Sequence, residues 1–99
     1  MRRAAKVDAN QADVVSSLRA VGATVTHLHA VGQGCPDILV GFRKKNVLFE
    51  IKDGNKPPSQ RKLTPQQVEW HDAWKGQAHV VNDKFEAVAL LMELTKSCD

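Results

Sequence analysis

Two short apolar segments on either side of a charged turn constrain the fold of this chain more than any other feature. They span Asp37–Phe42 and Val47–Lys52, and the four residues Arg43-Lys44-Lys45-Asn46 separate them. Segments of this length joined by a short polar turn are typical of a β-hairpin. The sequence therefore predicts a sheet that contains this hairpin.

The two faces of the hairpin differ in chemistry, because side chains alternate between the faces of a strand. We expect the turn to pair Phe42 with Val47. This register places Asp37 opposite Lys52. One face is then apolar, and consists of Ile38, Val40, Phe42, Val47, Phe49 and Ile51. The other face carries three ionisable groups, at Asp37, Glu50 and Lys52.

These three groups suit metal-assisted hydrolysis. Two neighbouring carboxylates repel unless a positive charge lies between them, and Mg²⁺ prefers oxygen ligands. Such an ion can polarise a phosphoryl oxygen and lower the pKa of its bound water, while Lys52 stabilises charge that develops on the phosphate. The alternative is a cross-strand Asp37–Lys52 ion pair beside a solvated Glu50. The Gly-x-Gly-x-Pro turn before Asp37 and the apolar residues elsewhere on both strands favour the metal site.

The rest of the chain predicts a sheet flanked by helices. Capping residues at Asp8 and Gln11, at Thr64 and Gln67, and at Asp83 and Glu86 mark three helix starts. On the first helix, Val14, Leu18 and Val21 form one apolar stripe. The expected elements are a helix over 8–21, strands over 24–30, 37–42 and 47–52, a helix over 64–75, a strand over 78–81 and a last helix from 83. This α-β-β-β-α-β-α order implies a mixed sheet.

Composition limits the class of protein. With 99 residues, 42% of them hydrophobic, the chain has the size of a single domain over 1–99. No segment approaches the ~20 apolar residues needed to cross a bilayer. The basic start Met1–Lys6 lacks the apolar stretch of a signal peptide, so we expect a cytoplasmic protein without a membrane partner. Cys35 and Cys98 are too few for a disulfide framework, and we expect Cys35 to be a buried thiol.

Three motifs in this order resemble the VRR-NUC branch of the PD-(D/E)XK nucleases. They are Gly34-Cys35-Pro36-Asp37-Ile38-Leu39-Val40-Gly41, Leu48-Phe49-Glu50-Ile51-Lys52-Asp53-Gly54 and Leu63-Thr64-Pro65-Gln66-Gln67. The resemblance extends from about Asp8 to the last helix. It implies a restriction-endonuclease-like α-β-β-β-α-β core, a mixed sheet flanked by helices, with an additional C-terminal helix.

The resemblance also implies roles for individual residues. Asp37 and Glu50 would bind Mg²⁺ or Mn²⁺, with the backbone carbonyl of Ile51 as a further ligand. Lys52 would be catalytic.

Two further residues match positions near the active site of this family. Asp13 stands where the family places a glutamate on the first helix, and its shorter side chain would reach the metal through water. The alternative, with equal weight, is that Asp13 is a first-turn carboxylate favoured by the helix dipole and has no role at the site. Gln67 matches a glutamine beside the active site, although it also closes the capping box.

The predicted function is metal-dependent DNA endonuclease activity. By resemblance to stand-alone phage and bacterial members, we expect selectivity for branched DNA such as a four-way Holliday junction, cut by a homodimer in a bacterial or phage-infected cell. Phosphate contacts are expected from Arg43, Lys44, Lys45, Lys56, Arg61 and Lys62. The alternatives are a nicking or end-processing nuclease and a non-catalytic DNA-binding module. Divalent-metal binding at the carboxylates separates the last of these from the enzymes.

Two aromatic groups lie outside the motifs. His27 and His29 share a face of the expected strand, and we expect surface or partly buried side chains there, with one approaching the DNA. Trp70 and Trp74 fall at i and i+4 on the second helix, which is typical of core or subunit-interface residues rather than base-stacking ones.

Overall fold

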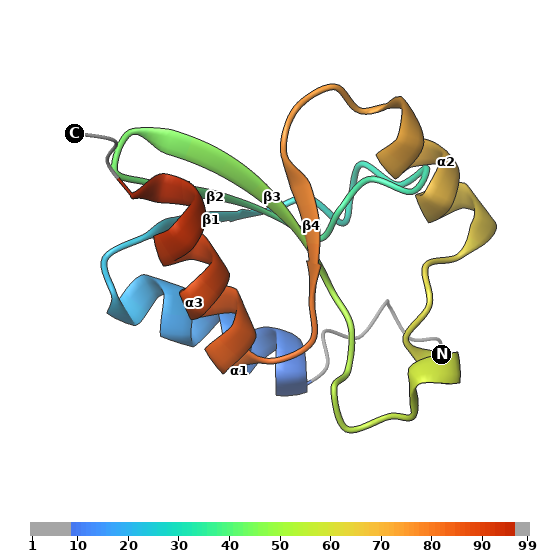
Figure 1. Cartoon of the computed structure of the whole chain (residues 1–99), viewed down its shortest axis with the longest axis horizontal. Coiled ribbons are helices and arrows are strands. Elements are labelled where there is room, and N and C mark those ends of the chain that lie inside the picture. Colours follow the sequence, from blue (N-terminus) through green and yellow to red (C-terminus); the bar gives the residue numbers. More distant parts are fainter. Residues whose placement is uncertain (1–8, 97–99) are drawn as a thin grey trace.

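Four strands form one mixed sheet in the order β1-β2-β3-β4, in a computed structural model that describes residues 9–96 (Figure 1). The first three strands form an antiparallel meander, and β4 runs parallel to β3 after a crossover through α2. In chain order the elements are α1 (Ala9–Ala20), β1 (Thr24–His27), β2 (Ile38–Phe42), β3 (Lys45–Ile51), the 3-10 helix η1 (Pro58–Gln60), α2 (Pro65–Ala73), β4 (Ala78–Val81) and α3 (Lys84–Thr95). The predicted order and the mixed α/β class are confirmed.

The turn of the hairpin is tighter than predicted. Phe42 pairs with Lys45, so Arg43 and Lys44 alone form the turn, with φ angles of 53° and 69°. Two consecutive positive φ angles match the backbone twist of a two-residue hairpin turn. The sequence did not reveal this turn because neither position holds the Gly, Asn or Asp that usually occupies it.

The predicted register is therefore wrong by two residues. Val47 pairs with Val40 rather than with Phe42. Because the shift is an even number of residues, every side chain keeps its predicted face. The shift changes only the partners, and it moves Asp37 from its predicted place opposite Lys52.

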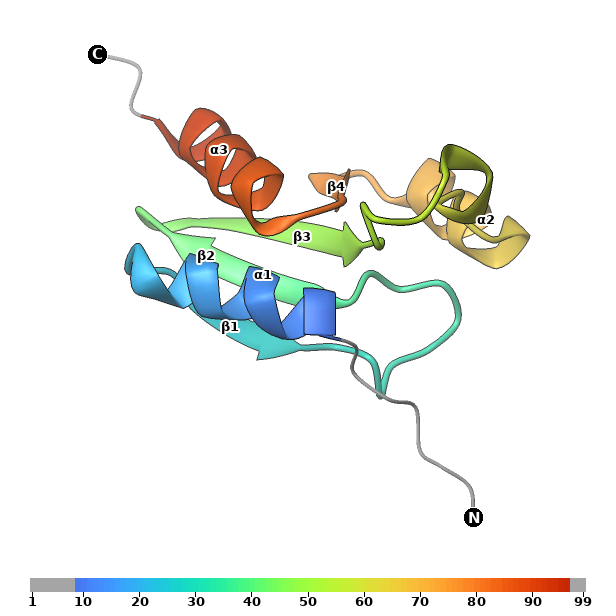
Figure 2. The ribbon, with the colours of Figure 1, turned by 90° about the horizontal axis from the view of Figure 1, so that it is seen from below.

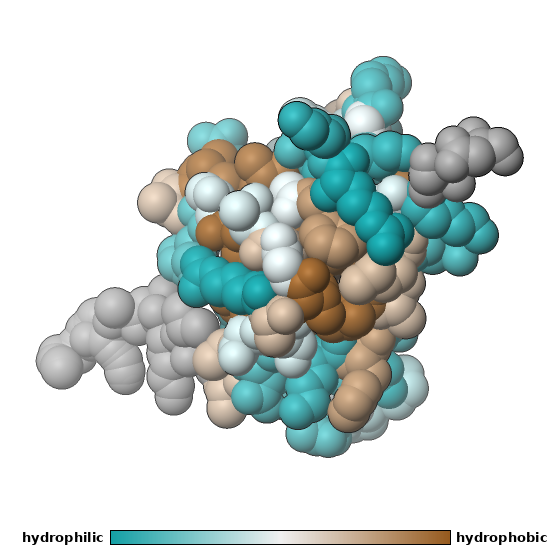
Figure 3. All heavy atoms as spheres, turned by 90° about the vertical axis from the view of Figure 1, so that its left-hand side faces the viewer, coloured by the Kyte–Doolittle hydropathy of each residue, from teal (hydrophilic) through white to brown (hydrophobic). Residues whose placement is uncertain are grey.

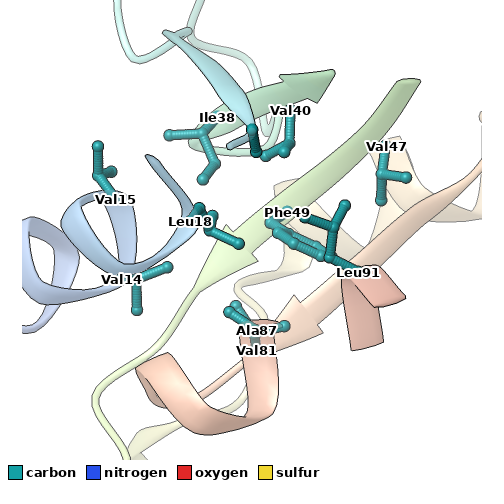
Figure 4. Packing of buried hydrophobic residues seen from close by; sticks show 11 residues of the cluster. Val14, Val15, Leu18, Ile38, Val40, Val47, Phe49, Val81, Ala87 and Leu91 are labelled. Carbon is teal, nitrogen blue, oxygen red and sulfur yellow. The ribbon is translucent and has the colours of Figure 1, made fainter. Parts of the chain in front are cut away.

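The apolar face of the hairpin packs against α1 and α3, which both cover one side of the sheet (Figure 2). Figure 4 shows Phe49 between Leu18 of α1 and Leu91 of α3. The fully enclosed core residues include Val14, Leu18, Ile38, Val40, Val47, Phe49, Val81, Ala87 and Leu91. The hairpin face predicted to be apolar is thus the base of the core.

One residue of the predicted helical stripe is not in the core. Val21 is 37% exposed, and Val15 is buried instead. The reason is that α1 ends at Ala20 and the chain turns at Gly22, where φ is +102°. Val21 therefore lies beyond the helical periodicity that would have placed it on the stripe.

Strand β1 also ends earlier than predicted. It stops at His27, so His29 is not on the strand and the two histidines do not form a strand i, i+2 pair. Their rings still lie 5.3 Å apart, on residues that are both exposed. The prediction that this strand lies beside the hairpin is confirmed by its pairing with β2.

Helix capping follows the sequence closely at two of the three helix starts. Thr64 and Gln67 form the predicted capping box of α2, and the Asp83 carboxylate accepts from the backbone N–H of Glu86 at α3. The Glu86 carboxylate binds Asn82 rather than returning to Asp83. The predicted cap at Asp8, the basic start Met1–Lys6 and Cys98 lie outside the described residues.

Helix α2 stands apart from the other helices, beyond the end of β3 (Figure 2). It contains no buried residue and ends at Ala73, before the expected Lys75. It lies tightly against the loop that leads to Asp37, because a Cβ on Gly34 would come within 2.5 Å of the Gln66 carbonyl oxygen. Gly34 also has a φ of +85°, so this close approach depends on glycine.

The outer surface carries both hydrophilic and hydrophobic residues. Figure 3 shows the end of the molecule on the left of Figure 1, where hydrophilic residues surround a group of hydrophobic ones. Between residues 9 and 96, no helix has the length and apolar character needed to span a membrane.

The turn geometry predicts a stabilising substitution. Replacing Arg43 by Asn and Lys44 by Gly should raise the free energy of unfolding by about 1 kcal/mol, because both residues then adopt positive φ with less strain. Urea unfolding measures the change. The double substitution to Gln is the matched control, since it removes both charges without relieving the backbone. Equal stabilisation in the control would assign the effect to charge repulsion and contradict the strain account.

Candidate active site

The register of the hairpin brings Asp37 beside Glu50. Strand β2 begins at Ile38, which pairs with Phe49, and the same register continued by one residue places Asp37 opposite Glu50. Opposite residues in an antiparallel pair have their Cβ atoms about 5 Å apart. The two carboxylates therefore share one face at the end of the hairpin, as the alternation of side chains predicted.

Glu50 is a buried carboxylate, with only 3% of the residue exposed. Its Oε2 accepts a hydrogen bond from Gln67 Nε2 at 3.1 Å and lies 3.6 Å from Lys52 Nζ. Its Oε1 is buried without a hydrogen-bond partner among the described residues. Burial, then the charge of Asp37, raises the pKa of Glu50 to about 7, although Lys52 lowers it. One oxygen of this site therefore lacks a positive partner.

Asp37 is held by the backbone of the neighbouring strand. Its Oδ2 accepts a hydrogen bond from the Ile51 N–H at 2.7 Å. Ile51 lies beyond the last β2–β3 pair, and continuing the register places Pro36 opposite it. Because proline has no N–H, Pro36 offers no backbone donor to the Ile51 carbonyl. Because the N–H and C=O of one strand residue point to the same side, the Ile51 carbonyl is expected on the β2 side of β3.

The alternative of an Asp37–Lys52 ion pair beside a solvated Glu50 is wrong. Lys52 pairs with Glu50, and Glu50 is buried rather than solvated. The two-residue shift of the register explains this difference, because it places Asp37 opposite Glu50.

Gln67 joins the helix cap to the site. Its Oε1 accepts from the Thr64 N–H and from Lys52 Nζ, both at 2.9 Å, while its Nε2 donates to Glu50. The capping role and the site role are therefore performed by one side chain at once. An amide can do this because its oxygen has two lone pairs and its nitrogen has separate donors.

The structure does not bring Asp13 to the other predicted residues. Asp13 is exposed on α1, and no hydrogen bond or ion pair joins it to them within residues 9–96. Helical periodicity explains its position, since the neighbouring Val14 and Val15 face the core. The α1 residue that reaches this end of β3 is Asn10, whose Nδ2 donates to the carbonyls of Lys52 at 2.6 Å and Asn82 at 3.1 Å.

Asn10 was missed by sequence reasoning. Its only signal was a polar residue in the first helical turn, a position that is usually solvated. The hydrogen bonds of Asn10 to Lys52 and Asn82 could not be predicted, because they require β3 and β4 to end side by side near the start of α1.

Three other residues near the site were not assigned to it from the sequence. Burial raises the pKa of the half-buried Cys35 thiol, and the charges of Glu50 and Asp37 raise it further. His71 and His79 each have a buried Nε2 without a partner among the described residues, and burial lowers the pKa of both. The position of Cys35 two residues before Asp37 was the available signal.

The predicted DNA-contacting residues fall into two separate places. Lys56, Arg61 and Lys62 lie in the segment between β3 and α2, at the same end of the sheet as the carboxylates. Arg61 Nε donates to the Lys56 carbonyl at 2.7 Å, which gives this loop a defined shape. The other three, Arg43, Lys44 and Lys45, lie at the opposite end of β2. That end is ~17 Å from Asp37, because a strand rises about 3.4 Å per residue.

The side chains could hold a divalent ion with oxygen ligands. No group of three His, Cys, Asp or Glu side chains gathers for a metal within the described part of the chain. Two carboxylates are present, however, and a hard cation such as Mg²⁺ is often bound by one or two carboxylates while it keeps several waters. The unpartnered Oε1 of Glu50 fits such an ion.

Comparisons of the chain with protein-family models, with curated proteins and with solved structures found no match. The residues of the site therefore carry the functional interpretation by themselves.

The raised pKa of Glu50 predicts how stability depends on pH without metal. Its ordinary pKa is 4.5 and its folded pKa is about 7, so the folded state holds a proton that the unfolded state releases. The free energy of unfolding should therefore fall by roughly 1–3 kcal/mol as pH rises from about 4.5 through about 7. Glu50→Gln should abolish this fall.

Urea unfolding in EDTA across this pH range measures the effect. The difference between wild type and variant isolates Glu50, because His71 and His79 titrate in both. Glu69→Gln, at an exposed site on α2, is the matched control and should keep the wild-type slope. Identical slopes for wild type and Glu50→Gln would contradict the prediction.

Proposed function

We propose that this protein is a metal-dependent nuclease of the PD-(D/E)XK class, in its VRR-NUC branch, which hydrolyses phosphodiester bonds in DNA. The observation that carries the proposal is the buried Glu50 carboxylate beside Asp37, with its Oε1 unpartnered and its Oε2 next to Lys52. A chain gains no stability from two carboxylates clustered in a half-buried place. A bound cation gives this arrangement a physical reason.

In the proposed site, Asp37 and Glu50 hold Mg²⁺ or Mn²⁺ through carboxylate oxygens. The Ile51 carbonyl, which has no donor from Pro36, is the further ligand. When bound, such an ion supplies Lewis-acid polarisation of a phosphoryl oxygen and acidifies water. The remaining parts of the mechanism come from the chain itself.

Lys52 is held in place on two sides. Its Nζ donates to Gln67 Oε1 at 2.9 Å and lies 3.6 Å from Glu50 Oε2. A fixed positive charge beside the reacting phosphate stabilises the negative charge that develops in the transition state. The ammonium also orients an attacking water by hydrogen bonding. Gln67 is a positioning residue, because it acts on the reaction through Lys52 and Glu50.

The substrate in this proposal is DNA with a branched structure. The basic segment with Lys56, Arg61 and Lys62 is at the site's end of the sheet, where it would contact phosphates without reading bases. Four-way junction cleavage on paired strands would require two sites related by a two-fold axis, and hence a homodimer. The junction and the dimer rest on the resemblance of the motifs.

Lysine 52 provides the direct test of nuclease activity. Lys52→Ala should lower the cleavage rate of labelled four-way junction DNA by ~10²–10⁴-fold in Mg²⁺ or Mn²⁺, because a positioned charge and proton donor is lost. Lys96→Ala, at an exposed site at the C-terminal end of α3, is the matched control and should cut like wild type. Flap and linear duplex substrates show the structural preference. Absence of cutting by wild type with either metal, while DNA binding persists, would support a non-catalytic module instead.

Metal binding can be measured without any substrate. At a Mg²⁺ concentration about 100 times its Kd, the wild-type chain should gain about 2.7 kcal/mol of stability, seen as a higher melting temperature that EDTA reverses. Asp37→Asn and Glu50→Gln should each lose most of this gain. Asp72→Asn, an exposed carboxylate on α2, should keep it. An equal gain in all four proteins would place the ion elsewhere.

Asp13→Asn in the same measurement addresses the helix-1 carboxylate. From its exposed position we expect the full metal-dependent gain to remain. A loss comparable to that of Asp37→Asn would show that Asp13 reaches the ion through water after all.

A further inference from the structure

Two tryptophans form a stacked pair at the C-terminal end of α2, with Trp70 on the helix and Trp74 at its C-cap. The rings of Trp70 and Trp74 have centroids 4.6 Å apart and planes inclined by 17°. Trp74 is 47% exposed, and α2 contains no buried residue. Of the two places expected for Trp74, the core is wrong, and the subunit interface stays a prediction. The Trp74 indole, backed by Trp70, presents a flat apolar surface outside the core.

This pair follows Gln67, a residue of the candidate active site, along α2. Gln67 and Trp70 lie at i and i+3 on one face of α2, and Trp74, the C-cap of the helix, stacks on Trp70. Gln67 is the residue that contacts Glu50 and Lys52. Trp74 follows it by seven residues, which is ~10 Å along a helix that rises 1.5 Å per residue.

Trp70 connects the pair to the other side of the site. A Cβ placed on Gly34 would lie 3.1 Å from the Trp70 Cβ, so Trp70 packs on the loop that leads to Asp37. Trp70 is only partly exposed, and it backs the outer Trp74 ring. The stacked pair thus lies against the loop that leads to Asp37.

The charges on α2 suit a polyanion at this face. Its two acidic residues, Glu69 and Asp72, fall on the opposite side of the helix by the 3.6-residue periodicity. Lys75 follows Trp74 directly and is exposed, and Lys52 stands at the other end of the face. A nucleic-acid strand that lies along the tryptophans therefore does not contact the two carboxylates of α2.

We propose that Trp74, backed by Trp70, is a stacking platform for an unpaired base of the nucleic-acid strand whose phosphate enters the site. This inference rests on the proposed function and defines its substrate as DNA with unpaired bases beside the cleaved bond. Bases stack on aromatic side chains with little regard to sequence, because every base has a π face. A base inside an intact duplex has both faces covered by its neighbours, so the platform favours branch points, flaps and single strands.

A second copy of the chain is a poorer occupant of this face. Helix α2 has nine residues, about 13 Å of helix, and a stable interface buries ~800 Å² on each partner. The exposed Trp74 and the partly exposed Trp70 provide a small part of that area. One nucleotide base, by contrast, matches the size of one indole ring.

The test is binding without cleavage. The affinity of a short fluorescein-labelled single strand and of a blunt duplex is measured by anisotropy in EDTA. Trp74→Ala should weaken single-strand binding by roughly 5- to 100-fold, the range that loss of one base–aromatic stack gives, and should change duplex binding little. Trp74→Phe should restore most of the single-strand affinity. Phe85→Ala, which removes an aromatic ring 76% exposed on α3, should bind like wild type.

The outcomes separate this inference from the proposed function. Wild-type single-strand affinity in Trp74→Ala, with α2 intact by circular dichroism, would overturn the platform. So would equal losses for single strand and duplex, which indicate a general effect on folding or charge. Loss of a dimer in Trp74→Ala by sedimentation, with unchanged single-strand affinity, would assign the face to a second copy and overturn it too. Because no cleavage is measured, a selective loss supports the platform even if the protein cuts no DNA.

Discussion

The burial of the Glu50 carboxylate is the constraint on which the site depends. A buried carboxylate needs partners, and here they come from two elements that are far apart in the sequence. Lys52 returns to the same face of β3 two residues later, and Gln67 reaches over from the start of α2. These contacts tie α2 to the end of the sheet although the helix buries no residue of its own. The carboxylate thus joins its own strand to α2.

The close approach of α2 to the loop before Asp37 completes this arrangement. Gly34 permits contact with the Gln66 carbonyl, and Asp37 then binds the Ile51 N–H at the open end of the hairpin. Burial, and then the charge of Asp37, raises the pKa of Glu50, and one Glu50 oxygen has no hydrogen-bond partner among the described residues. The proposed metal, the proposed role of Lys52 and the proposed base platform all refer to this one corner of the molecule.

Much of this corner could be predicted because a register shift of two residues does not change the face on which a side chain lies. The hairpin turn is two residues shorter than expected, yet an even shift keeps Asp37, Glu50 and Lys52 on one face. Their pairing could not be predicted, since Arg43 and Lys44 adopt positive φ without the residues that normally signal it. The role of Asp13 stays a prediction, because the residue is exposed and no hydrogen bond joins it to the other predicted site residues within residues 9–96. Matching a residue to a place along a helix does not specify the direction in which that helix faces.

The sequence by itself determined the order of helices and strands, the two faces of the hairpin, and the caps at Thr64 and Asp83. These are local properties, set by periodicity and by hydrogen bonds between residues close in the chain. Only the tertiary structure decided that Gln67 reaches Glu50, that Asn10 reaches Lys52 and that Trp74 stays exposed. Each of these depends on how elements distant in the sequence come together, which no local pattern specifies.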